Sequence, residues 1–533
     1  MRISRAMRFA VLVAGTLAES AFEPVDFNVT NALVDLGVNV DFISKLSGPV
    51  EGSSRDACRI ACNALEYTFG SDSVDTPRRP SYDSFTNTYW SLQQASVDPY
   101  CIFKPSKREQ VSVVVLLSRL TQCPFAVKSG GHAAFAGASS IEGGITVALE
   151  RMNEITLSSD NKIASIGPGN RWQDVYTRLE SQDLAVVGGR VAAIGVGGLT
   201  LGGGISFFSN QYGWACDNVA SYEVVTASGI VVTASLSSSS DLYWALRGGG
   251  NNFGIVTRFD LQTIPQGKMW GGGRLLNEAA FPAAIKAFYN LGMNSAQDKD
   301  AAQILSFAYA QNTKFASADL QYAKPVANTS IFAEYMAIPA MKDTTQIRSL
   351  SNLTMQFDAS NPNGLRETYW TATFKLDEAF AAFTKDVFFE EIAAIADAPS
   401  LVPAVTLQVI TTPQLEKMAQ NGGNPLGLDA KDGPLILLNL NMMWSLIDDD
   451  TRILETNSKI LDRTVAEAEK RGLAVDYIYM NYASQYQSVV PSYGEANQDT
   501  LEQIAHHYDP IGVFQKLQPG YFKLGGAPVS SAP

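Results

Sequence analysis

Two glycine-rich segments in the first half of the chain constrain its fold most. SGGHAAFAGAS spans 129–139, and GGRVAAIGVGGLTLGGG spans 188–204. Glycine lets backbone amides approach an anion closely because no Cβ intervenes, and successive N–H groups form an anion-binding concavity. One such turn is ordinary, but two segments predict a long ligand that contains a pyrophosphate. Neither matches GxGxxG or GxxxxGK[ST], which disfavours nicotinamide-binding Rossmann folds and nucleoside triphosphatases.

The charge balance and the scarcity of histidine exclude other function classes. The 533 residues include 40 Lys and Arg against 53 Asp and Glu, a net charge of −13 at pH 7. Without a basic cluster the chain lacks the means to neutralise phosphates, so we expect no nucleic-acid or membrane partner. The histidines are His132, His506 and His507. We expect no metal site, and we interpret the adjacent pair as surface or helix-cap residues.

The amino terminus indicates export. A cationic MRISRAMR precedes the apolar FAVLVAGTLA, which predicts a signal peptide over residues 1–20, with a buried helix as the alternative. Glycosylation sequons begin at Asn28, Asn328 and Asn352. No later run approaches the ~20 apolar residues of a membrane span. We therefore expect a secreted, monomeric protein, or one in the lumen of the secretory pathway.

The five cysteines fit an oxidising compartment. Cys58 and Cys62 are four residues apart in a helical pattern, so they share one face and each could reach Cys101 or Cys123. The pattern predicts at least one disulfide and leaves the pairing open. It also leaves Cys216 as the expected buried free thiol.

The composition changes near residue 270. Short Val, Ile and Ala strands, glycines and helices fill the first half, with a hairpin expected around Ser228-Gly229. Pro265 and the glycines at 271–273 are interpreted as a boundary. From 275 to 470, helices rich in Ala and Phe alternate with strands such as LILLNLNMMW, which predicts an antiparallel sheet covered by helices on one face.

Several motifs together resemble one family. KSGGH, GVGGLTLGGG, YGWACDNV, DLYWALRGGGNNFGIVTRF, YMNYASQ and YDPIGVFQ, in this order, are similar to motifs of the secreted FAD-linked oxidases related to berberine bridge enzyme, especially fungal ones. The resemblance implies an α+β fold of the p-cresol methylhydroxylase type, a two-lobed FAD-binding domain with an inserted substrate domain. The expected division is an FAD-binding part at 21–267, a substrate-binding domain at 268–474, and the rest of the FAD-binding domain at 475–533.

The resemblance also implies how FAD is held. The histidine of the SGGH loop forms a covalent bond to the flavin in this family, and here it is His132. Val191 stands where many relatives carry a second, cysteinyl link, so we expect a single attachment, which makes carbohydrate oxidation less favoured. Ile194 stands at a position that gates oxygen access to the flavin. The other residues expected to bind the cofactor are Ser129, Gly130, Gly131, Gly137, Ala138, Gly195, Gly197, Gly198, Gly202, Gly203, Asn218, Gly254, Val256 and Asn481.

The catalytic base is expected from the segment DYIYMNY. Read as a strand over 476–482, it places Ile478, Met480 and Tyr482 on one face. Related enzymes use the tyrosine of the matching AsnTyr pair as the proposed base, which makes Tyr482 our candidate and ordinary packing the alternative. A phenol needs a nearby positive charge to act as a base at neutral pH. Polar residues in the inserted strands are candidate substrate ligands, with solvent exposure as the alternative: Gln408, Asn439 and Asn441.

These expectations combine into one reaction. A substrate carbon gives a hydride to flavin N5, Tyr482 takes a proton, and O2 is the expected electron acceptor. The family's fungal members usually serve secondary metabolism, so the substrate is expected to be a small metabolite that undergoes alcohol oxidation, desaturation or oxidative cyclisation. The alternatives are a carbohydrate oxidase and a cyclase in which FAD is mainly structural.

Overall fold

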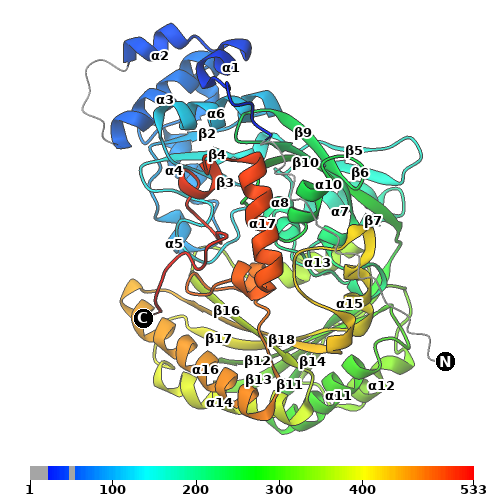
Figure 1. Cartoon of the computed structure of the whole chain (residues 1–533). Coiled ribbons are helices and arrows are strands. Elements are labelled where there is room, and N and C mark those ends of the chain that lie inside the picture. Colours follow the sequence, from blue (N-terminus) through cyan, green and yellow to red (C-terminus); the bar gives the residue numbers. More distant parts are fainter. Residues whose placement is uncertain (1–21, 47–53, 533) are drawn as a thin grey trace, which may run out of the picture.

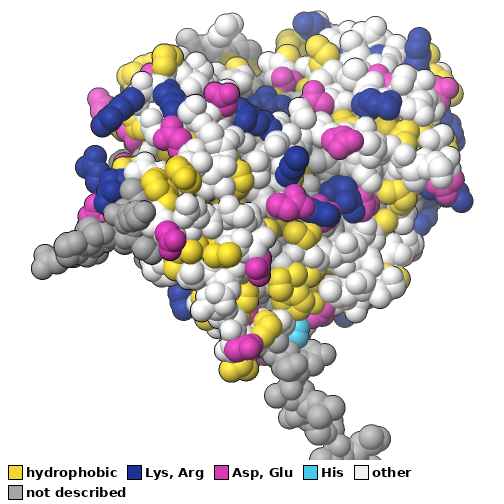
Figure 2. Space-filling model, turned by 90° about the horizontal axis from the view of Figure 1, so that it is seen from above, with side chains coloured by type: hydrophobic (Ala, Val, Ile, Leu, Met, Phe, Trp, Pro, Cys, Tyr) yellow, Lys and Arg dark blue, Asp and Glu magenta, His cyan; other side chains and the backbone are white. Residues whose placement is uncertain are grey.

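A computed structural model describes residues 22–46 and 54–532. The expected signal peptide lies outside the described residues. Within them, no helix has both the length and the apolar character needed to cross a membrane. On the face shown in Figure 2, basic and acidic side chains are interspersed with small apolar groups.

A small sheet near the amino-terminal helices contains four strands in the order β1-β2-β4-β3. The strands are β1 (Val74–Asp75), β2 (Cys101–Phe103), β3 (Phe125–Lys128) and β4 (Ile145–Ala148). Helices α1 (Val29–Asp35), α2 (Val40–Leu46), α3 (Ser54–Phe69) and α6 (Arg108–Thr121) lie beside it (Figure 1). β2 and β3 both run parallel to β4, and α6 provides the crossover between β2 and β3.

Two disulfides attach α3 to this sheet region. Cys58 bonds to Cys123 and Cys62 bonds to Cys101, which confirms the prediction of a disulfide and resolves its pairing. The helical spacing of the first two cysteines places them on the face of α3 that packs against α6. Cys216 is a buried free thiol, as expected.

A second sheet contains six strands, with the order β5-β6-β10-β8-β9 and β7 paired to β10. Its strands are β5 (Ile155–Leu157), β6 (Ile163–Ile166), β7 (Leu184–Val186), β8 (Val219–Val225), β9 (Val231–Ser235) and β10 (Ile255–Pro265). The hairpin predicted around Ser228-Gly229 joins β8 to β9 and is confirmed. Helices associated with this region are α7 (Trp172–Glu180), α8 (Val196–Leu201), α10 (Ser240–Ala245) and, from the end of the chain, α17 (Glu495–Tyr508). α17 packs against α10, so segments distant in sequence lie side by side (Figure 1).

The third sheet contains nine strands whose pairs are all antiparallel, as predicted. The main order is β14 (Lys342–Asp343), β11 (Met269–Asn277), β13 (Thr313–Tyr322), β12 (Ala301–Ala310), β17 (Val402–Ile410), β18 (Leu435–Trp444), β16 (Arg366–Lys375) and β19 (Ala474–Val475); β15 (Gln346–Arg348) pairs with β11. Helices α11 (Phe281–Met293), α14 (Glu378–Glu391) and α16 (Asp450–Arg471) cover its outer face, and the other face is turned toward the rest of the molecule (Figure 1). The α+β class is confirmed.

The second sheet ends with β10 at Pro265 and the third begins with β11 at Met269, and the glycines at 271–273 belong to β11, where their backbones pair with β13. One local prediction is wrong. The segment 476–482 is not a strand beyond β19. It runs irregularly into a 3-10 turn over Met480–Tyr482, in which the Tyr482 N–H donates to the Tyr479 carbonyl. Tyr479 and Tyr482 therefore line the same cavity, whereas strand alternation would have separated them.

Candidate functional site

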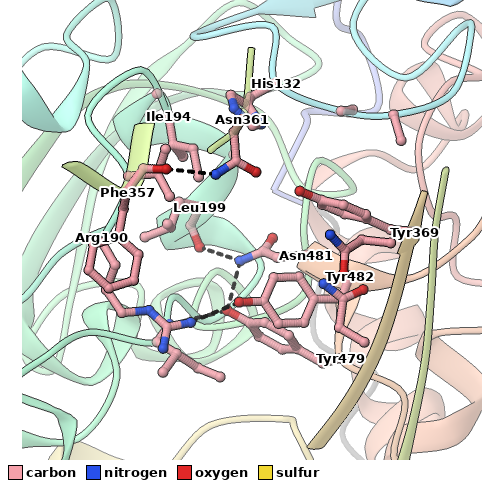
Figure 3. A pocket seen from close by; sticks show the side chains of 18 of the residues that line it. His132, Arg190, Ile194, Leu199, Phe357, Asn361, Tyr369, Tyr479, Asn481 and Tyr482 are labelled. Atoms are coloured by element: carbon pink, nitrogen blue, oxygen red, sulfur yellow. Dashed lines mark hydrogen bonds between the residues drawn. The ribbon is translucent and has the colours of Figure 1, made fainter. Parts of the chain in front are cut away.

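A cavity of about 770 Å³ lies between the two glycine-rich segments and the inner face of the nine-stranded sheet (Figure 3). This volume is within the range of small-molecule and cofactor sites. The residues expected at the site that line the cavity are Ser129, Gly131, His132, Ala138, Val191, Ile194, Gly195, Gly197, Gly198, Gly254, Val256, Gln408, Asn439, Asn441, Asn481 and Tyr482. The fold thus brings together residues more than 300 positions apart in sequence.

The glycines behind this wall make its close packing possible. Gly130 and Gly195 are in backbone contact, and a Cβ on either would overlap the other's main chain. A Cβ on Gly202 would collide with the Asn481 amide. Gly137 and Gly203 adopt φ values of 84° and 110°, which favour glycine.

Asn218 does not reach the cavity. Its side-chain amide is buried and donates to the carbonyls of Tyr212 and Trp214, at 3.0 and 2.8 Å. It therefore stabilises the turn before β8. The YGWACDNV motif marks this turn rather than a residue of the cavity wall.

His132 is the imidazole of the site, and its side chain is partly buried. Its ring stacks on Trp90, with the ring centroids 4.2 Å apart and the planes inclined by 12°. Among the described residues, Nε2 is buried without a hydrogen-bond partner. Burial lowers the pKa of His132 to about 4, assisted by the charge of Arg171 and opposed by a backbone hydrogen bond. The imidazole is therefore neutral at neutral pH, with a lone pair available for a covalent bond.

Tyr482 lies at another part of the wall, held by two donors. Arg190 donates from Nη2 to the phenol oxygen at 2.8 Å, and Gln408 donates from Nε2 at 3.1 Å. The same Arg190 nitrogen also donates to Gln408 Oε1 at 2.6 Å. The three side chains form one network, in which a guanidinium is directed at the phenol oxygen.

Sequence reasoning missed Arg190, although it is the one charged residue in the segment 188–204. It follows the glycine pair at 188–189, where a Cβ on either residue would collide with the Trp172 ring. That close packing fixes the backbone from which Arg190 extends. A single charged residue in an otherwise uncharged glycine-rich segment is the sequence feature that could have indicated a functional role for Arg190.

Aromatic rings enclose Tyr482. Tyr479 and Tyr369 both pack edge to face against it, at centroid separations of 4.9 and 6.0 Å. The Tyr479 hydroxyl accepts from the backbone N–H groups of Gly204 and Ile205, at 3.2 and 3.1 Å. Burial raises the pKa of Tyr479 above its ordinary value. It is therefore a neutral phenol that attaches the carboxyl-terminal segment to the second glycine segment.

The inner face of the nine-stranded sheet supplies the remaining wall. Side chains at alternate positions of β12, β13, β17 and β18 point into the cavity, as the period of two requires. Asn441 Oδ1 accepts from Thr406 Oγ1 at 3.3 Å. Asn439 Oδ1 is buried and has no partner among the described residues. The predicted polar face of β18 thus borders the cavity.

These features fit FAD. The cavity borders two close-packed glycine segments, whose exposed main chain suits a pyrophosphate. It also borders the neutral imidazole of His132, with an unpartnered buried nitrogen. A cavity of this volume that combines both features suits an elongated dinucleotide, for which Tyr482 and the sheet would provide part of the wall.

Comparison with known proteins agrees with this geometry. Residues 99–235 match the family described as "FAD binding domain". The chain is 37% identical over 491 residues to FAD-dependent monooxygenase tpcD of Cochliobolus heterostrophus, covering 89% of this chain and 95% of that protein. It is 36% identical over 490 residues to FAD-dependent monooxygenase FUP4 of Fusarium proliferatum, covering 88% and 95%.

Solved structures share the fold at low sequence identity. Xylooligosaccharide oxidase from Myceliophthora thermophila superposes with a TM-score of 0.69 at 22% identity, covering 90% of this chain and 100% of that one. Berberine bridge enzyme from Eschscholzia californica gives 0.68 at 15%, covering 85% and 97%. These structures show that the chain has the fold of berberine bridge enzyme, and the relatives above show that it belongs to the fungal FAD-dependent monooxygenases that include tpcD and FUP4.

Proposed function

We propose that this enzyme oxidises a small secondary metabolite, with FAD attached through His132 alone and Tyr482 as the proton acceptor. One observation supports this proposal most strongly. The Tyr482 phenol oxygen lies in the cavity wall and accepts hydrogen bonds from Arg190 and Gln408. In this proposal the FAD-binding part comprises residues 21–267 and 475–533, the substrate domain comprises 268–474, and the mature chain is a secreted monomer.

The protein's contribution is to hold a proton acceptor beside the reacting carbon. When bound, FAD would supply the acceptor for the hydride of the substrate carbon, with O2 as the final electron acceptor. Tyr482, in its phenolate form, accepts the proton from the substrate hydroxyl and becomes a neutral phenol. Arg190 supplies the positive charge that a phenol needs for this role, because its guanidinium stabilises negative charge on the oxygen it contacts. Gln408 keeps that oxygen directed into the cavity.

The test uses the purified holoenzyme under anaerobic conditions with a panel of benzylic and allylic alcohols. We expect at least one alcohol to bleach the flavin's visible absorbance and to yield one equivalent of carbonyl product per flavin. Turnover that continues after the flavin has been reduced chemically would instead support a cyclase with a structural FAD.

The names of the relatives favour monooxygenation as a second candidate reaction. Both proteins described above are called FAD-dependent monooxygenases. Turnover under ¹⁸O2 separates the reactions. Oxidase chemistry releases labelled peroxide and leaves the organic product unlabelled, whereas monooxygenation transfers one labelled oxygen atom to the product.

Replacement of Arg190 by methionine is expected to lower kcat about 10- to 100-fold, because the phenol oxygen loses its cationic donor. Part of this loss of kcat should be recovered as the pH is raised, because a higher hydroxide concentration favours proton removal in the absence of the Arg190 charge. Arg190→Lys should retain more activity than Arg190→Met. Arg178→Met, which removes an exposed arginine of α7, is the matched control. A uniform loss at every pH would contradict this role.

Replacement of Ile194 by valine is expected to increase the rate of O2 consumption several-fold, because the smaller side chain opens the cavity wall at this point. Reduction of an artificial dye should change little. Steady-state rates with O2 and with the dye measure this ratio. Ile264→Val, the same change in the core of β10, is the control. An unchanged ratio of the O2 rate to the dye rate would contradict a role of Ile194 in controlling oxygen access.

A further inference from the structure

A carboxylate borders the cavity on the inner face of the nine-stranded sheet. Asp319 on β13 lines the cavity, and its Oδ2 accepts from Ser317 Oγ at 3.0 Å. No salt bridge found in the described part of the chain includes Asp319, although Lys342 lines the cavity from β14. An ionised carboxylate accepts up to about four hydrogen bonds, so one hydroxyl leaves most of its capacity unused.

The sheet provides a place for this carboxylate. Asp319 pairs with Gly273 on β11, and a Cβ on that glycine would lie 2.7 Å from Asp319 Oδ1. The missing side chain therefore leaves the room that the carboxylate occupies. Gly273 lines the cavity as well, so Asp319 lies over a glycine in the wall itself.

Strand register relates Asp319 to the proposed reaction centre. Asp319 pairs with Ile304 on β12, and the β12–β17 register, with Leu305 opposite Leu407, continues this row to Gln408. Gln408 donates to Tyr482. Neighbouring strands are about 4.8 Å apart, so two spacings separate the backbones of Asp319 and Gln408 by roughly 10 Å.

Ile304 is the residue between these two points, and the polar side chains in the neighbouring rows of the wall are largely satisfied by one another. Ser306 and Thr406 share a hydrogen bond of 2.9 Å, and Thr406 donates to Asn441. Asn439 Oδ1, in a residue only 6% exposed, has no partner among the described residues and also faces the cavity. The wall therefore offers a substrate two open acceptors, Asp319 and Asn439.

We propose that Asp319 is a specificity-determining residue that binds a hydrogen-bond-donating group of the substrate, a hydroxyl or an ammonium, two strand spacings (roughly 10 Å) across the sheet from Gln408, which contacts Tyr482. The substrate is then elongated, with its reacting alcohol at Tyr482 and a donor at its far end. The position of the oxidised carbon rests on the function proposed above. The recognition by Asp319 is a binding property and is measured separately.

The probes are three benzyl alcohols whose para chains end in an ammonium, a hydroxyl or a methyl group, about 10 Å from the carbinol carbon. Affinities are measured by calorimetry on FAD-loaded Tyr482→Phe protein, in which turnover does not interfere. We expect the ammonium or the hydroxyl probe, or both, to bind at least tenfold more tightly than the methyl probe. Asp319→Leu should remove this advantage. Asp319→Asn should remove it for the ammonium and keep it for the hydroxyl.

Controls separate recognition from folding. Asp343→Asn removes a carboxylate of the same sheet that does not line the cavity and should leave the preference intact. The methyl probe should bind all variants equally, which verifies an intact cavity. Equal binding of the three probes to the starting protein would overturn the proposal, and so would a preference that survives Asp319→Leu. Failure of every alcohol to reduce the flavin of the native chain would refute the proposed function and leave the binding result standing.

The ammonium preference should also depend on pH. Burial raises the pKa of Asp319 to about 6, against the opposing effect of the Ser317 hydrogen bond. The carboxylate is therefore ionised above pH 6, where the preference should be complete, and it should weaken as the pH falls below 6. Lys342 on β14 is the charged side chain that lines the cavity from the adjacent elements.

Discussion

Replacement of Tyr482 by phenylalanine is expected to slow reduction of the flavin by about 100- to 10,000-fold, the usual contribution of a positioned general base. The change removes the one oxygen to which both Arg190 and Gln408 donate, and it keeps the ring that packs against Tyr479 and Tyr369. Affinity for the alcohol should change little. Stopped-flow absorbance under anaerobic conditions gives both quantities.

The matched control for this result is Tyr486→Phe. Tyr486 packs against Trp370 and does not line the cavity. The same loss of one hydroxyl four residues along the chain should leave flavin reduction unchanged. A Tyr482→Phe enzyme that reduces its flavin within a factor of three of the native rate would assign proton removal to another group.

Replacement of His132 by alanine is expected to abolish the covalent retention of FAD by the denatured protein. In the native protein, we expect acid precipitation to give a yellow pellet, because a covalent flavin stays with the denatured chain. In His132→Ala the yellow colour should move to the supernatant. The neutral imidazole, with its unpartnered buried Nε2, is the group whose loss causes this change.

His507→Ala is the control, since His507 lies in the last turn of α17 and does not line the cavity. Its pellet should stay yellow. The His132→Ala protein should still bind FAD reversibly, because the glycine segments that face the cavity are unchanged. A yellow pellet from His132→Ala would indicate a different point of attachment.

Regular patterns in the sequence predicted most of the secondary structure that surrounds the site. LILLNLNMMW alternates with a period of two, and in β18 its two asparagines do face the cavity. The four-residue spacing of Cys58 and Cys62 predicted a helix that presents both to one side, as α3 does. Such predictions succeed because they depend on local geometry alone.

Features set by tertiary contacts were less predictable. The segment 476–482 has strand-like composition, but no strand in the described part of the chain pairs with it past β19, and contacts of Tyr479 with the second glycine segment fix its course instead. Glycines at 271–273 resemble a linker in sequence, although β13 pairs with them along their length. The network of Arg190, Gln408 and Tyr482 joins three distant segments, so no local pattern contains it.

Peptide mass spectrometry tests the proposed covalent attachment of FAD to His132 most directly. Trypsin cleaves after Lys128 and Arg151, so the histidine is recovered in one peptide, SGGHAAFAGASSIEGGITVALER. We expect this peptide from the native protein to carry the mass of FAD, with fragment ions that place the addition on His132. An unmodified peptide, from protein whose yellow colour is released by acid, would contradict it.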